Sequence, residues 1–282
     1  MRHRALLVAA LAALAGLLAG CGAKAEPTGA IAAFPAHAVD AAGAAIVVPA
    51  EPTRIVSLDA GATHVLRDLG LGNAIVETDP AHAIAVIGET PPSLVVAPGH
   101  LDAGELDRLR SATTAPLFLY GADPIEDAPQ VVAQLGLAVG RGPEAAALAQ
   151  RIDDGLAAVR RSVAGSPRVR TLVEGAGFTA YGPTSPAGID VAAAGGENVV
   201  SADQPLDLTG IPGLDVAAWV ALDPGGSTLV RLRTYRELAQ VPAVRDGRVL
   251  QVPRDGFPVD ATLPGRLRQL ADDLHAPPVT TG

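Results

Sequence analysis

The stretch PEAAALAQRIDDGLAAVRRSVA, residues 143–164, determines how the rest of the chain is organised. Its apolar residues recur at helical spacing, at Ala145, Leu148, Ala149, Ile152, Leu156 and Val159. Pro143 and Glu144 are typical of a helix start, and Gly165 is typical of a helix end. We therefore expect one long helix in the middle of the chain, within residues 141–165.

On both sides of this helix, short apolar runs alternate with helical patterns, which is typical of α/β units with parallel strands. Residues 34–140 predict strands at 54–58, 94–97 and 117–120 and helices at 62–69, 103–111 and 124–137. Residues 166–276 predict strands at 168–173, 228–232 and 248–252 and helices at 188–194, 215–222 and 263–275. The predicted fold is α/β, with two lobes that each contain a small, mostly parallel sheet and are joined by one long rigid helix. Residues 277–282 are expected to be a tail.

The N-terminus has the pattern of a secretory signal peptide over residues 1–20, with a basic start and an apolar run from Ala5 to Ala19. Leu18-Ala19-Gly20-Cys21 resembles the bacterial lipoprotein box, in which the cysteine becomes lipidated. We expect Cys21 to be the lipid anchor and residues 21–33 to be a flexible spacer. The alternative is an ordinary signal peptide beside a chance cysteine. Either reading exports the chain, and the first anchors it to the extracytoplasmic face of the cell membrane.

Composition and net charge limit the kinds of partner that we expect for this chain. The 282 residues carry a formal net charge of −9, opposite in sign to what a phosphate backbone attracts, so nucleic acid is not an expected partner. Aromatic residues are scarce, with one Trp, three Tyr and four Phe, so the position of each is informative.

Motifs of catalysis or metal binding are missing from the sequence. It contains no G-x-S-x-G, no complete G-x-G-x-x-G, no H-E-x-x-H and no pair of cysteines. The histidines after the signal peptide are scattered singly, at His37, His64, His82, His100 and His275. We expect neither an enzyme nor a resident cofactor or metal.

Several stretches, taken in order, resemble the substrate-binding proteins of ABC importers for iron complexes, haem and cobalamin. They are Phe34-Pro35 with Asp40 and Gly43, the run from Val47 to Leu58, Pro91 to Val96, Tyr181 to Val199, and Val241 to Val249 with the last helix ending at His275. The resemblance covers about residues 34–275. It implies a class III substrate-binding protein fold, a ligand cleft between the lobes, an ABC permease as partner and a monomer.

The chain departs from this family at the acidic residues that pair with permease arginines. Their positions align with Ala85 in the first lobe and Ala217 in the second. Glu89 and Asp215 lie nearby and are the alternative docking residues. The stretch between Val76 and Val95 is also shorter than in relatives.

The loops that follow parallel strands are expected to face the cleft. This rule selects Asp59, His100 and Tyr120 in the first lobe, and Phe178, Tyr181, Arg231, Arg233, Tyr235, Arg254 and Phe257 in the second. Five of the few aromatic residues are in this set, which favours a flat or apolar ligand. For Tyr120 and Phe178, completion of a strand's core face is the alternative.

The chemistry of these residues suggests an iron complex as the bound solute. The planar guanidinium groups of Arg231, Arg233 and Arg254 suit the carboxylates of haem or of a siderophore. The alternative is that these arginines lie on a solvated strand edge and bind no ligand. Tyr235, or His100 or His64, could ligate haem iron axially. The single Trp219, predicted on a helix, weighs slightly against cobalamin.

Two functions remain open at this point. The first is an extracytoplasmic lipoprotein that captures a ferric siderophore or haem, or alternatively cobalamin, for an ABC importer. The second is an envelope lipoprotein of the same fold without permease coupling, acting as a store or interaction protein.

Overall fold

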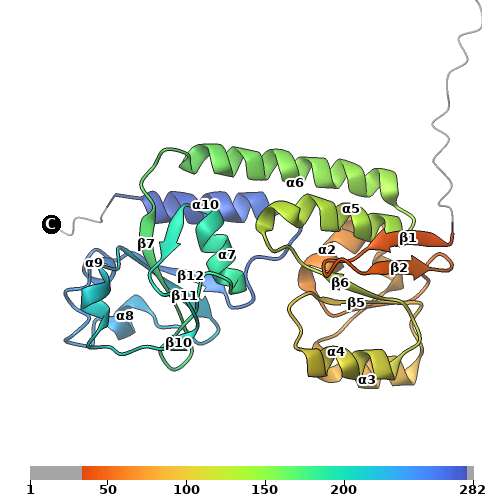
Figure 1. Ribbon diagram of the computed structural model, residues 1–282, viewed down its shortest axis with the longest axis horizontal. Helices are drawn as coiled ribbons and strands as arrows, with labels where there is room; N and C mark the ends of the chain where they lie inside the picture. Colours follow the sequence, from red (N-terminus) through yellow and green to blue (C-terminus); the bar gives the residue numbers. More distant parts are fainter. Residues whose placement is uncertain (1–33, 278–282) are drawn as a thin grey trace, which may run out of the picture. The chain divides into compact units, whose positions relative to one another are not determined.

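Helix α6 (Gly142–Val163) joins two α/β lobes in the computed structural model, which describes residues 34–277 (Figure 1). It buries Ala145, Leu148, Ala149, Ile152, Leu156 and Val159, the six apolar positions that predicted it. It packs against α5 (Ala128–Ala138) and α10 (Leu263–His275). The expected architecture of two lobes and a linking helix is confirmed. Cys21 and the expected signal peptide, residues 1–20, lie outside the described residues.

The first lobe is built on a parallel sheet in the order β4-β3-β5-β6. Its elements are β1 (Ala36–Val39), β2 (Ala45–Val48), β3 (Ile55–Ser57), α2 (Ala60–Asp68), η1 (Gly72–Ala74), β4 (Ile75–Glu77), α3 (Pro80–Glu89), β5 (Leu94–Pro98), α4 (Ala103–Ala112), β6 (Leu117–Tyr120), η2 (Ile125–Asp127) and α5. Strands β1 and β2 form a separate antiparallel hairpin. In its turn, the Asp40 carboxylate accepts hydrogen bonds from the amides of Ala42 and Ala44, as expected for an Asp at this position.

The second lobe contains a mixed sheet in the order β10-β8-β7-β11-β12, with β9 beside β7. Its elements are β7 (Val169–Gly175), β8 (Thr179–Ala180), α7 (Pro186–Ala193), β9 (Gly196–Asn198), β10 (Gln204–Pro205), η3 (Ile211–Leu214), β11 (Ala218–Asp223), α8 (Leu229–Leu232), α9 (Pro242–Arg245), β12 (Val249–Pro253) and α10. Strands β7, β11 and β12 are parallel, so their carboxyl ends share one edge.

Two predicted elements of the second lobe are wrong. The stretch 215–222 was expected to be a helix, but its apolar residues form the central strand β11, with Trp219 buried on it. A short run buried on both faces has no periodicity that separates strand from helix. The stretch 228–232 was expected to be a strand, but it forms the single helical turn α8, which the Thr228 hydroxyl caps by accepting from the Arg231 amide. The sequence also failed to predict β4 and α3.

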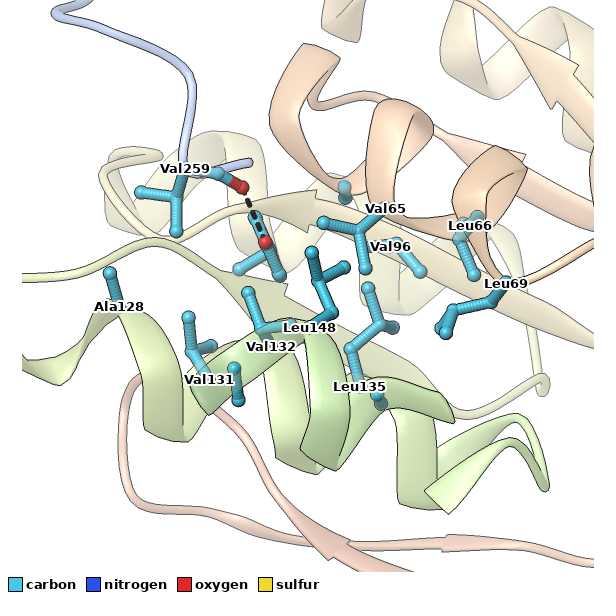
Figure 2. Packing of buried hydrophobic residues seen from close by; sticks show 14 of the residues in the cluster. Val65, Leu66, Leu69, Val96, Ala128, Val131, Val132, Leu135, Leu148 and Val259 are labelled. Atoms are coloured by element: carbon cyan, nitrogen blue, oxygen red, sulfur yellow. Dashed lines mark hydrogen bonds between the residues drawn. The ribbon is translucent and has the colours of Figure 1, made fainter. Parts of the chain in front are cut away.

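The core of the first lobe draws on segments that are far apart in the sequence. Figure 2 shows Val65 and Leu66 of α2, with Leu69 at its C-terminal cap, facing α5 and α6. The facing side chains are Val131, Val132 and Leu135 of α5 and Leu148 of α6, and Val259 lies at the edge of this group. Val259 belongs to the segment that follows β12, so the chain returns from the second lobe to this core. Helix α10 then contributes Leu263 and Leu267 to the same core, and Leu270 and Leu274 to the core of the second lobe.

Among residues 34–277, none of the helices combines the length and apolar character needed to span a bilayer.

Candidate functional site

A cavity of about 280 Å³ lies between the lobes and is lined by residues of both. The first lobe contributes Asp59, His100 and Tyr120, which follow or end strands β3, β5 and β6. The second lobe contributes Ile189 and Asp190 from α7 and Thr184 from the loop before it. A second hollow of about 510 Å³ shares Asp59, His100, Asp255, Gly256 and Pro258 with it. The two hollows therefore form one cleft, which is within the size range of small-molecule sites.

Residues 254–262, which we call the strap, connect β12 to α10 and line the cleft between the lobes. In the second lobe, the Asp190 carboxylate accepts a hydrogen bond of 2.6 Å from the Phe257 amide. In the first lobe, the Tyr120 hydroxyl donates a hydrogen bond of 2.6 Å to the Val259 carbonyl, drawn as the dashed line in Figure 2. His64 Nδ1 lies 2.7 Å from the Asp260 carboxylate. The strap is thus held to both lobes by side chains.

Close backbone contact fixes the strap further at Gly61 in the first turn of α2. A Cβ at this position would lie 2.8 Å from the Val259 amide nitrogen, so a side chain would push the strap away. A glycine is therefore required at this position for the strap to reach the first lobe.

Asp59 is held at the cleft by helix capping. Its carboxylate accepts a hydrogen bond of 2.8 Å from the Ala62 amide and so caps α2, directly after β3. Burial raises the pKa of Asp59, although this hydrogen bond and the charge of the nearby His100 oppose the rise.

Asp190 is the most buried carboxylate of the cleft, with 2% of its surface exposed. Burial raises the pKa of Asp190 to about 7, against the opposing effects of the Phe257 amide and the Arg266 charge. Its Oδ2 atom accepts from Phe257, and Oδ1 has no hydrogen-bond partner among the described residues. The charge of this group therefore changes near neutral pH.

Residues 34–277 contain no group of three or more His, Cys, Asp or Glu side chains arranged to hold a metal ion. Within the cleft, His100 is the one imidazole among the lining residues. It could supply a single ligand to a metal that is already held by a chelator.

Comparisons with known proteins found relatives in sequence and in structure. No protein-family model matches the chain. Cobalamin-binding proteins from two strains of Halobacterium salinarum are 28% identical to it over 262 residues, covering 77% of this chain and 70% of theirs. The apo structure of RhuT, a periplasmic heme-binding protein from Roseiflexus sp. RS-1, has a TM-score of 0.64 at 22% identity, covering 79% of this chain and 97% of that one. A structure described as an ABC-type Fe3+-hydroxamate transport system from Saccharomonospora viridis has a TM-score of 0.66 at 18% identity, covering 86% and 100%.

The chain has the class III substrate-binding protein fold. In this fold the cleft described above lies between the lobes, and the linking helix α6 packs beside α10.

Four of the residues predicted from the sequence line the cleft of this class III fold: Asp59, His100, Tyr120 and Phe257. The rule that loops after parallel strands face the ligand selected the first three. Phe257 belongs to the strap and packs on the cores of both lobes.

Three other predicted residues form a cluster of their own in the second lobe. The rings of Phe178 and Tyr235 meet edge to face with centroids 5.2 Å apart, and the Arg231 guanidinium lies 5.0 Å from the Phe178 centroid. Phe178 and Tyr235 pack on the core around Trp219. None of the three is among the residues that line the two hollows.

The remaining predicted residues also lie outside the two hollows. Tyr181 packs on the core that contains Val173, with its ring against Gly175. Arg233 and Arg254 are exposed. The lining of the hollows therefore includes none of the three arginines that suggested an anionic ligand.

The sequence missed the carboxylates that line the cleft beside Asp59. Asp255 directly follows Arg254 after β12, so the same rule about strand ends could have selected it. Asp123 lies in the loop after β6, where the rule also applies. Asp190 lies inside helix α7, and Asp79 follows the unpredicted strand β4, so no sequence signal marked either.

The residues considered for permease docking are at the surface. Glu89 ends α3 and is exposed, as is Ala85 on the same helix. Asp215 has a positive φ of 51° after η3, and one of its oxygens lies 3.9 Å from Nε of Arg170. Ala217, which immediately precedes β11, is partly buried.

Proposed function

We propose that this protein is an extracytoplasmic solute-binding protein that captures a metal complex in the cleft between its lobes and delivers it to an ABC importer. The observation that carries the proposal is the cleft itself, of about 280 and about 510 Å³, in a chain of class III fold. In this proposal the function is binding of the solute, without bond chemistry.

The solute is an iron complex or a corrinoid. Heme and ferric hydroxamates are the ligands in the descriptions of the two structural neighbours, and cobalamin is the ligand of the curated relatives. All of these molecules hold a chelated metal. Heme and corrinoids also have an axial position that a side chain can occupy, whereas a hexadentate ferric trihydroxamate has none.

His100 is the residue that we expect to reach the metal. It lines both hollows, it is exposed, and it makes no hydrogen bond with the described residues. Tyr120 is not free to do so, because its hydroxyl already donates to Val259 and because burial, with the charges of Asp59 and Asp260, raises the pKa of its phenol well above the ordinary value. Tyr235 lies in the separate aromatic cluster.

Lipidation at Cys21 would keep the protein at the outer face of the membrane, within reach of a permease. Docking through Glu89 and Asp215 is part of the proposal. The alternative, a store without a permease, is favoured by one observation: the positions expected to carry the docking glutamates hold Ala85 and Ala217.

The test is a titration of the full-length protein with heme, ferric hydroxamates and cyanocobalamin, followed by Trp219 fluorescence and by visible absorption. We expect at least one complex to bind at micromolar concentration or below. If heme or cyanocobalamin binds, His100→Ala should shift the absorption bands of the bound complex, whereas the exposed His82→Ala should not. If none of the complexes binds, the proposal is wrong.

A further inference from the structure

The side chains that line the cleft have one sign of charge. Six carboxylates line the two hollows, from Asp59, Glu77, Asp79, Asp123, Asp190 and Asp255. No Lys or Arg is among the described residues that line them. The two other titratable groups in the lining are His100 and the buried phenol of Tyr120.

Only two of the six carboxylates have an ion pair outside the cleft. Glu77 lies 2.8 Å from Arg67, and Asp79 lies 2.8 Å from His82. For Asp59, Asp123, Asp190 and Asp255, no basic side chain lies within 4 Å among the described residues. Among the described residues, these four carboxylates are therefore not neutralised by an ion pair.

We propose that the cleft selects metal complexes of zero or positive net charge and discriminates against anionic ones, heme and ferric catecholates included. This inference rests on the proposed function, because it names the class of complex that the same cleft takes.

The physical reason is the position of the carboxylates in a partly desolvated cavity. Asp190 and Asp59 have both lost hydration through burial, which is why the pKa of each is raised. A cation in the cavity replaces part of that lost solvation, whereas an anion adds repulsion in a region of low dielectric. Neutral complexes that present amide N–H groups can donate to the carboxylate oxygens at no electrostatic cost.

The inference predicts how binding depends on pH. The groups around Asp190 are Arg266 of α10, the Phe257 amide of the strap, and Asp59, Asp123, Asp255 and His100 across the cavity. Because the pKa of Asp190 is about 7 without ligand, this group is mostly protonated at pH 6 and mostly ionised at pH 8. A cationic complex favours the ionised form, so its affinity should rise between pH 6 and 8. An anionic complex should show the opposite slope, and a neutral one little change.

The test compares two complexes that differ in charge and share the same metal centre. Ferrioxamine B is a linear ferric trihydroxamate with a free ammonium group, and its N-succinyl derivative carries a carboxylate in its place. Two unit charges near the carboxylates correspond to a factor of about ten in affinity at solvent-like dielectric. We expect the full-length protein to bind the cationic form at least about tenfold more tightly at pH 8 and low salt, with a smaller ratio at pH 6.

Asp255→Asn identifies the origin of the preference. Asp255 is exposed and makes no hydrogen bond, so its substitution leaves the fold intact. We expect it to lower the ratio of the two affinities by about two- to threefold. The matched control, Asp153→Asn on the exposed face of α6, removes the same charge from a residue that does not line the cleft and should leave the ratio unchanged.

The outcomes separate this inference from the function on which it rests. If the succinylated complex, or heme, binds as tightly as ferrioxamine B or more tightly, the charge preference is wrong and the proposed function stands. If neither these complexes nor cyanocobalamin binds, the proposed function itself has failed.

Discussion

Tyr120 is buried at the end of β6, and its hydroxyl donates the hydrogen bond that holds the Val259 carbonyl of the strap. Tyr120→Phe leaves that carbonyl without a partner, which costs about 1–3 kcal/mol of unfolding free energy. Urea denaturation at pH 7 measures the change. The control is Tyr235→Phe, because the Tyr235 hydroxyl makes no hydrogen bond with the described residues, and we expect a change within about 0.5 kcal/mol. Equal effects of the two substitutions would show that the strap does not depend on this bond.

Asp190 gives stability an unusual dependence on pH. Its folded-state pKa of about 7 lies above the ordinary value of 3.8, so between these values the folded protein binds more protons than the unfolded chain. The contribution of Asp190 to the unfolding free energy is therefore largest below the ordinary pKa, and it is lost as the pH rises through about 7. The loss amounts to about 4 kcal/mol, an order-of-magnitude figure.

Asp190→Asn tests this directly, since the amide oxygen can still accept from Phe257 and carries no charge. The unfolding free energy of the variant minus that of wild type should increase steadily from pH 4 to pH 8, because only wild type loses stability as Asp190 ionises. A difference between the two proteins that does not change with pH would contradict the assignment. Asp153→Asn should show no such trend.

For single residues, the sequence could predict which side chains line the cleft when those residues end or directly follow a strand. Asp59, His100 and Tyr120 follow or end strands with clear apolar runs, and they line the cleft. The sequence could not predict Asp190, because its role depends on where the strap returns, a contact between residues 67 positions apart. Arg254 and Asp255 are neighbours after the same strand, and sequence alone gave no reason to prefer the second.

Among the elements, the contact between α5 and α6 shows how tightly the linking helix is seated. A Cβ at Gly136 would lie 1.9 Å from the Cβ of Ala145, so these helices approach too closely for any side chain at this position. Gly136→Ala should destabilise the protein by about 1–3 kcal/mol, despite the better helix propensity of Ala.

Gly88→Ala in α3 is the control, because a Cβ there has no atom within 4 Å. It should stabilise the protein by about 0.5–1 kcal/mol. Thermal unfolding of the two variants measures whether each substitution stabilises or destabilises the protein. Stabilisation by Gly136→Ala would mean that α5 and α6 do not pack as described.

Elements with a clear period or a clear cap were predictable from the sequence. Helix α10 was predicted with its observed bounds, because its apolar stripe is regular and His275 ends it. The misassigned elements are the buried strand β11 and the one-turn helix α8, which carries Val230 at 78% exposure. The first lacks periodicity because both faces are buried, and the second is too short to have a period.

At the scale of the whole molecule, three connections link the lobes: α6, the strap and α10. Helix α10 places apolar residues in the cores of both lobes, so a large opening of the cleft would expose them to water. We therefore expect ligand capture with modest movement of the lobes. The sequence predicted the two lobes and the linking helix, but it gave no indication that the last helix bridges both cores.

The central claim is that the cleft between the lobes is the ligand site, and a substitution that fills it tests the claim most directly. Thr184 is exposed and lines the cavity from the second lobe, whereas Thr90 is equally exposed at the end of α3, away from the cleft. The measurement is the affinity of full-length wild type, Thr184→Trp and Thr90→Trp for the tightest-binding metal complex. We predict that Thr184→Trp weakens binding by about ten- to a hundredfold, because the indole takes the ligand's volume, and that Thr90→Trp leaves it unchanged. Undiminished binding by a folded Thr184→Trp variant would place the ligand elsewhere and contradict the account.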